Sequence, residues 1–375
     1  MTGDALPDKG AVLEEVLRAY FLRAGFFVIR GVPFRFVDED LTNIDLWLYE
    51  RPTGTSRRVL VCDIKYKQRP KAVERVFWTS GLRDALGVDG AYIATTDNRR
   101  SLRSVAEKLN LKLIDGADIQ RIQNSPKVLY KDRIGDEQLI QELQLVDRES
   151  RNKSLTEARL DILSALSEGF GAPSAVRALE AFARLAATVV TCHPDSNAAR
   201  ATGRLAYLAA AITCESLDYV SVGAAFRTLD ERRELMLKAV RLGALSSEDG
   251  QQRLKFALAL IEKYGPGGRS AAIAVETGLK KELEGVPAEI VADQAIRLLK
   301  GDQLFWTGRE LEMESYHVAL HPFDALSQQS KSMVGALLDY AGVDRQRFAE
   351  AWTAMPAAIV AAEETAAEVV EDGSV

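Results

Sequence analysis

Two apolar segments with alternating side chains, residues 43–49 and 60–65, constrain the fold of this chain more than any other feature. Alternation with a period of two is the signature of a β-strand, because successive side chains point to opposite faces. The residues between them, 51–56, include Pro, Gly, Thr and Ser, which favour a hairpin connection. We therefore predict two neighbouring antiparallel strands.

These strands carry the residues of chemical interest. Asp45 lies on the first, and Asp63 and Lys65 share one face of the second, since side chains at i and i+2 project to the same side. Pairing of the strands is expected to bring the two carboxylates together beside the ammonium. Such oxygen ligands suit Mg²⁺ or Mn²⁺, and a lysine at this position can orient or deprotonate an attacking water.

Further elements surround the predicted hairpin. Apolar residues at helical spacing predict an amphipathic helix over 11–24 that ends at Gly25 and places Glu14 on the edge of its apolar stripe. Glu14 is thereby positioned to reach the proposed metal site. The other predicted elements are strands at 26–29, 90–96 and 111–114 and helices at 70–86 and 102–109. The predicted order is α-β-β-β-α-β-α-β, an α/β domain with a mixed sheet.

With these residues and this order of elements, residues 10–120 resemble the PD-(D/E)XK, or restriction-endonuclease-like, nuclease superfamily, with a pattern closest to Holliday-junction resolvase and Mrr-like domains. Asp45 corresponds to the aspartate of the first half-motif, and Asp63-Ile64-Lys65 to the second. The resemblance implies that Asp45, Asp63, Lys65 and Glu14 are catalytic and that the backbone carbonyl of Ile64 is a metal ligand beside Asp45, Asp63 and Glu14. Two positions depart from the pattern: Ile44 stands where the motif has proline, and Asp63 where many relatives have glutamate.

Structural roles compete with these functional ones. Asp45 and Asp63 can be ordinary polar strand residues offset by Lys65 across the strands. Glu14 can pair with Arg18 at i+4 on a solvated helix face. Tyr66 and Trp78 are candidates either for stacking on a base or for packing within the domain.

The charge distribution favours a nucleic-acid partner for the first third of the chain. Residues 1–125 hold 20 Lys and Arg against 17 Asp and Glu, whereas the whole chain has a net charge of −6. Basic side chains near the proposed site are candidates for phosphate contacts, and a solvated surface is the competing interpretation. These candidates are Arg57, Arg58, Lys67, Arg69, Lys71 and Arg75.

Beyond residue 125 the alternation gives way to alanine- and leucine-rich segments at helical spacing, which predicts an all-helical domain over 126–375. Helices or helix pairs are predicted at 155–168, 174–190, 200–216, 224–242, 247–264, 270–284, 287–300 and 323–365. This domain resembles no known family, and substrate binding, homodimerisation or recognition of a protein partner are its expected roles.

The chain contains 3 Cys and 3 His. The cysteines have no paired spacing, which argues against a disulfide framework or a zinc ribbon and favours a reducing compartment. No histidine lies within 1–125, so histidine-based catalysis by the nuclease-like domain is excluded. His317 and His321 are spaced i, i+4, but Pro322 and the lack of a third ligand argue against a metal pair.

Together these features predict a Mg²⁺-dependent nuclease that hydrolyses phosphodiester bonds, with DNA favoured as the substrate and RNA as the open variant. The resemblance implies a role in prokaryotic defence or DNA repair. The alternative is an inactive module that keeps the nuclease fold and binds nucleic acid or serves as a scaffold in a larger assembly. We expect a cytoplasmic protein with no membrane partner, because no signal peptide is visible and the apolar runs are short.

Overall fold

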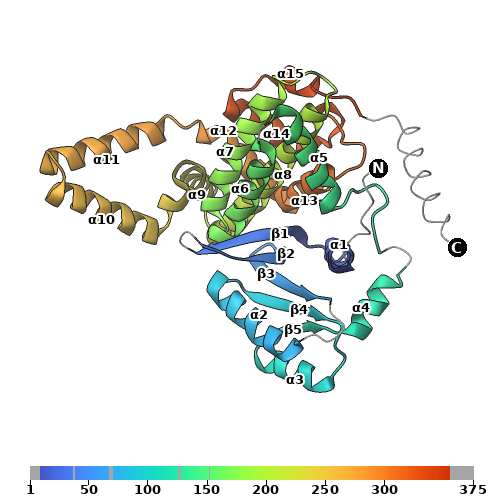
Figure 1. The fold of residues 1–375 in the computed structure, drawn as a ribbon. Helices are drawn as coiled ribbons and strands as arrows, with labels where there is room; N and C mark the ends of the chain where they lie inside the picture. Colours follow the sequence, from blue (N-terminus) through green and yellow to red (C-terminus); the bar gives the residue numbers. More distant parts are fainter. Residues whose placement is uncertain (1–8, 37–38, 67–70, 126–127, 152, 355–375) are drawn as a thin grey trace. The chain divides into compact units, whose positions relative to one another are not determined.

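The computed structural model describes residues 9–36, 39–66, 71–125, 128–151 and 153–354. The chain forms two compact units (Figure 1). Unit 1 comprises residues 1–141 and 159–167, and unit 2 the remainder, 142–158 and 168–375. Unit 1 therefore extends past the boundary predicted at residue 125.

Unit 1 is built on one five-stranded sheet with strand order β1-β2-β3-β4-β5. β1, β2 and β3 are antiparallel, whereas β4 and β5 run parallel to β3, which confirms the predicted mixed sheet. The crossover from β3 to β4 passes through a helix, as parallel neighbours require. The strands are β1 (Phe27–Phe36), β2 (Glu39–Thr53), β3 (Ser56–Lys65), β4 (Gly90–Thr95) and β5 (Lys112–Ile114).

Both faces of this sheet are buried, which explains why its central strands are apolar on both sides. Trp47 and Tyr49, which share the predicted polar face with Asp45, are 2% and 0% exposed. α1 (Lys9–Arg23) covers one face, where Phe21 packs edge-on against Tyr92 of β4 with ring centroids 5.0 Å apart. Tyr92 pairs with Cys62 in the ladder, so the next residue, Asp63, faces the opposite side.

Up to β5, the helices of unit 1 follow the predicted order. α2 contacts β3 and β4 and packs on α3, while α1 contacts α4 (Figure 1). α4 begins with a capping box in which the Asp115 side chain accepts from the N–H groups of Ala117 and Asp118. The remaining helices here are α2 (Ala72–Leu86), α3 (Arg100–Lys108) and α4 (Gly116–Gln123), and α5 (Asp136–Ser150) and α6 (Ser154–Glu168) each supply residues to both units.

Helices joined by turns and loops make up the described residues of unit 2. Its longer helices are α7 (Ala172–Val189), α8 (Asn197–Ser221), α9 (Leu229–Leu242), α10 (Glu248–Tyr264), α11 (Gly268–Glu284), α12 (Ala288–Leu298), α13 (Gln303–Ser315), α14 (Gln328–Ala341) and α15 (Arg345–Ala349). Short 3-10 helices are η1 (Val222–Ala224), η2 (Gly243–Ser246), η3 (Lys300–Asp302) and η4 (Phe323–Ala325).

α8 is the central helix of unit 2. It packs against α7 and α13, and its residues 205–212 are all fully buried. The segment Asn197–Ala224 is long and apolar enough to cross a membrane, yet 78% of its most apolar window is buried inside the structure. Burial of this kind is also what the core helix of a helical bundle shows.

Three helices were missed in the sequence: α4, α5 and α13. In α5 the buried residues Leu139, Leu143 and Val146 follow helical spacing, but acidic and amide residues fill the positions between them. In α13 aromatic residues interrupt the alanine- and leucine-rich texture on which the other predictions depended. α14 and α15 lie within the predicted segment 323–365, separated at Gly342 with φ +65°.

Candidate active site

The candidate site lies where β2 and β3 diverge. Their pairing ends at Leu46 and Cys62, so the N–H of Ile64 has no partner on β2 in that ladder. It donates instead to Oδ2 of Asp45, at 2.6 Å. The predicted placement of Asp45 beside the Asp63-Ile64-Lys65 segment is therefore a feature of the structure, with the side chain of Asp45 replacing a backbone acceptor.

Burial makes the charge on Asp45 costly. It raises the pKa of the Asp45 carboxyl above its ordinary value, and the hydrogen bond from Ile64 and the positive charges of Lys65, Arg75 and Arg30 offset this only in part. Glu14 lies close enough to Asp45 for the charges of the two carboxylates to interact. Its pKa is also raised, by burial first, and the charge of Asp45 adds to the effect.

Asp63 is held by an arginine. It is 6% exposed, and both of its carboxylate oxygens accept hydrogen bonds from Arg75 of α2, one of them from Nε at 2.9 Å. Lys65, which the competing structural interpretation paired with the acids, forms no hydrogen bond or ion pair with any residue that the structure describes. The charge of the Lys65 ammonium nevertheless acts on Asp45, where it lowers the pKa of the carboxyl.

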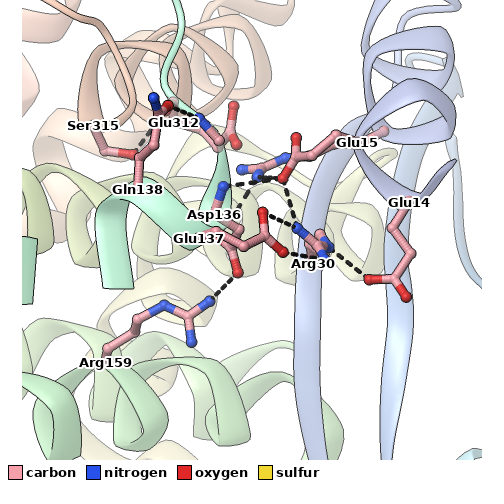
Figure 2. A network of polar contacts seen from close by, with 11 residues as sticks. Glu14, Glu15, Arg30, Asp136, Glu137, Gln138, Arg159, Glu312 and Ser315 are labelled. Carbon is pink, nitrogen blue, oxygen red and sulfur yellow. Dashed lines mark hydrogen bonds and ion pairs between the residues drawn. The ribbon is translucent and has the colours of Figure 1, made fainter. Parts of the chain in front are cut away.

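Glu14 belongs to a second cluster, centred on Arg30 of β1 (Figure 2). Nε of Arg30 donates to Glu14 at 2.7 Å, and its other nitrogens reach Glu15 at 2.9 Å and Glu137 at 2.6 Å. The suggested pairing of Glu14 with Arg18 is wrong, since Arg18 is bound by Glu15 instead.

Arg30 was missed in the sequence because it follows the apolar run that predicts the first strand. It is only 7% exposed. Burial alone would lower the pKa of its guanidinium, but the hydrogen bond with Glu137 and the charges of Glu14 and Glu15 raise it. A charged residue within an otherwise apolar strand predicts a buried ion pair, because a charge is buried only with a partner of opposite charge.

The predicted phosphate contacts separate into different groups. Arg57 is buried, and its guanidinium donates to the carbonyls of Thr53 and Ser56 at 3.0 Å, so it holds the hairpin turn, and its role as a DNA contact stays a prediction. Arg58 and Lys71 are partly or fully exposed and form surface pairs with Glu50 and Glu74. Lys67 and Arg69 lie outside the described residues.

The donor set fits a hard divalent cation at Asp45. Two partly buried carboxyl groups with raised pKa values, Asp45 and Glu14, lie near each other, and a cation between them would relieve the penalty that burial imposes on both. Asp63 fits only when Arg75 releases it. Within the described residues, the oxygens of Glu14, Asp45 and Asp63 do not all approach within 4.8 Å of one another, so the predicted ligand trio is not assembled in this arrangement.

Aromatic side chains lie next to Arg75 on α2. The Arg75 guanidinium lies 5.6 Å from the ring centre of Trp78. Trp78 and its neighbour Phe77 are 45% and 59% exposed, and with Phe34 and Leu41 they line an apolar hollow of about 310 Å³. Tyr66 is 43% exposed, so Tyr66 and Trp78 are both partly buried, and both stacking on a base and packing within the domain stay open for them.

Comparisons of the chain with protein-family models, with curated proteins and with solved structures each return no match. What the site does must therefore be inferred from its own residues.

Proposed function

We propose that this chain is a Mg²⁺-dependent nuclease with a restriction-endonuclease-like first domain, and that DNA is its substrate. The observation that supports the proposal most is the hydrogen bond from the Ile64 N–H to Asp45, which places a partly buried carboxyl with a raised pKa beside the segment of the adjacent strand that carries Lys65. Acids whose pKa values are shifted by burial and by neighbouring charges gather at catalytic sites, which favours a hydrolase over an ordinary solvated strand face.

Asp45 and Asp63 would hold the metal, with Glu14 and the Ile64 carbonyl as further oxygen donors. When bound, the ion supplies Lewis-acid polarisation of the phosphate and a more acidic water. Lys65 would hydrogen-bond the attacking water or the phosphate oxygen that gains charge. Arg75, once released from Asp63, would be free to contact the phosphate, because a guanidinium fits phosphate with two parallel hydrogen bonds.

A nucleic acid as the substrate is supported by the surroundings of Arg75. Exposed Trp78 and Phe77 beside a cation form a surface on which an unpaired base can stack, at about 1–3 kcal/mol per base. A role in prokaryotic defence or DNA repair rests on the resemblance alone, and RNA is the variant that the same surface would also accept.

The experiment compares the wild type with Lys65→Ala on labelled linear, circular, single-stranded and branched DNA and on RNA, in Mg²⁺, Mn²⁺ or EDTA. The expected result is metal-dependent cleavage that falls by about 10²–10⁴-fold in Lys65→Ala, the usual contribution of a positioned proton-transfer group. Lys108→Ala, which changes a lysine at the end of α3 away from the site, is the matched control and should cleave like the wild type.

One observation favours a second candidate, an inactive binding module: the Asp63–Arg75 pair neutralises the second acid without a metal. Under that alternative the wild type and Lys65→Ala would bind DNA equally and neither would cleave it in any condition. Cleavage of equal rate in both proteins would also contradict the nuclease proposal.

A further inference from the structure

A cluster in unit 2 combines two histidines with a glutamate. Glu314 lies near the end of α13, and His317 and His321 follow in the turn before Pro322. Their ligand atoms lie within 4.8 Å of one another, and Nδ1 of His321 is 2.9 Å from Oε2 of Glu314. The two imidazole rings lie with centroids 4.4 Å apart at an angle of 34°.

Glu314 is the third ligand that the sequence did not reveal. The two histidines are four residues apart, but the chain leaves the helix at Tyr316, so helical spacing does not predict where their side chains meet. The turn brings His321 back over the last turn of α13, next to Glu314.

Buried side chains from elsewhere in unit 2 fix the backbone of this turn. Arg204 of α8 donates to the carbonyl of His317 at 2.7 Å, and Tyr207 to that of His321 at 3.1 Å. Nε1 of Trp352 donates to the carbonyl of Leu320, a non-glycine residue with φ +33°. Such outer contacts hold ligand side chains in place before a metal arrives.

The spacing of the donor atoms suits a transition metal. Two atoms bound to one ion at about 2.0–2.2 Å lie roughly 3–3.5 Å apart. Oε2 of Glu314 and Nδ1 of His321 are 2.9 Å apart, so they need to move only slightly away from each other to admit an ion. The ligand atom of His317 lies within 4.8 Å of the other two, so on the same basis it must approach them by at most about 1–2 Å.

The donor types select the class of metal. Imidazole nitrogen with one carboxylate favours Zn²⁺, Co²⁺, Ni²⁺ or Fe²⁺ over Mg²⁺ and Ca²⁺, which prefer oxygen alone. Three protein ligands leave at least one coordination position open to water or a small ligand.

We propose that Glu314, His317 and His321 bind one divalent transition-metal ion of the Zn²⁺ class. The ion replaces the direct Glu314–His321 hydrogen bond, and if Nδ1 of His317 is the ligand atom, also the hydrogen bond that this nitrogen accepts from the Ala319 N–H at 3.2 Å. This site is independent of the proposed nuclease site in unit 1.

The test is calorimetric titration of the full-length chain with Zn²⁺ in the presence of excess Mg²⁺, together with Co²⁺ absorption spectroscopy. All titrations use a parent protein that carries Asp45→Asn, which removes a ligand of the proposed nuclease site. Zn²⁺ binding is then measured at the histidine cluster, whether or not the nuclease proposal holds. We expect one ion per chain, with Zn²⁺ affinity reduced at least about 10-fold in His317→Gln, His321→Gln and Glu314→Gln.

His193→Gln is the matched control, because His193 is the remaining histidine and lies on an exposed loop beside Cys192. Its Zn²⁺ affinity should equal that of the parent protein. Circular dichroism in EDTA checks that each variant is folded, and Zn²⁺ should raise the melting temperature of the parent protein itself. An absence of Zn²⁺ binding and of a melting shift in the parent, or binding that is lost in His193→Gln but kept in His321→Gln, would overturn the proposal.

Discussion

Both carboxylate oxygens of Asp63 are bound by the guanidinium of Arg75, so the second acid of the candidate active site is neutralised by an arginine from the following helix. A planar guanidinium matches a carboxylate through two parallel hydrogen bonds. A metal ion and Arg75 therefore compete for the same two oxygens.

Arg75→Ala should lower the stability of the metal-free protein and raise its affinity for Mn²⁺. Removing the arginine leaves a buried carboxylate without a partner, which costs up to about 3–5 kcal/mol when both partners are buried and less here because Arg75 is one-quarter exposed. Thermal melts in EDTA and in Mn²⁺ measure both effects. Arg103→Ala, which breaks a more exposed pair with Asp115, should show no such dependence on Mn²⁺, and an equal response in the two variants would contradict the competition.

Asp45→Asn should stabilise the metal-free protein at neutral pH. Burial raises the pKa of Asp45 above its ordinary value, so folding disfavours the ionised form. The contribution of Asp45 to the free energy of unfolding is fully present below the ordinary pKa of aspartate. It is lost as the pH rises through the pKa of Asp45 in the folded protein. Urea midpoints in EDTA should therefore differ between the two proteins at pH 7.5 and converge near pH 4.

Asp97→Asn should change stability in the opposite direction to Asp45→Asn at neutral pH. The hydrogen bond from Arg99 lowers the pKa of Asp97, so its contribution to stability is present above the ordinary pKa and disappears as the pH falls through the folded value. This variant should be less stable than the wild type at pH 7.5 and should approach it in acid. A gain in stability at neutral pH would show that the carboxylate is not stabilised there.

Arg30→Met should destabilise unit 1 strongly. The substitution leaves Glu14 and Glu15 without their shared cation in a largely buried setting, at a cost of about 3 kcal/mol. Arg35→Met on the same strand breaks an exposed pair with Asp40 and should cost less than about 1 kcal/mol. Chemical denaturation gives the free energy of unfolding of both variants. An equal loss in the two would show that the ion pairs of Arg30 are not the cause.

Gly203→Ala should destabilise unit 2 by about 1–3 kcal/mol, because an added Cβ would lie 2.6 Å from the ring of Trp352. Gly278→Ala on α11 has no neighbour within 4 Å and should instead stabilise its helix by about 0.5–1 kcal/mol. Melting temperatures that shift in the same direction in both variants would contradict the close approach at Gly203.

The sequence by itself determined the α-β-β-β-α-β-α-β order of the first unit up to β5, the mixed sheet and the helical character of the rest. Local patterns suffice for these features, because alternation and helical spacing record which side chains face a core. The adjacency of Asp45 to the Asp63-Ile64-Lys65 segment also followed, since a short turn between two strands fixes their pairing.

The tertiary structure decided which charges meet. Arg75 binds Asp63 from 12 residues away, Arg30 gathers Glu14 with Glu137, and Glu314 completes a cluster with His317 and His321. Sequence spacing does not specify these contacts, because they depend on how helices and turns pack beside strands or on where a chain leaves a helix. Long-range partners of charged side chains are set by burial, which exists only once the chain has folded.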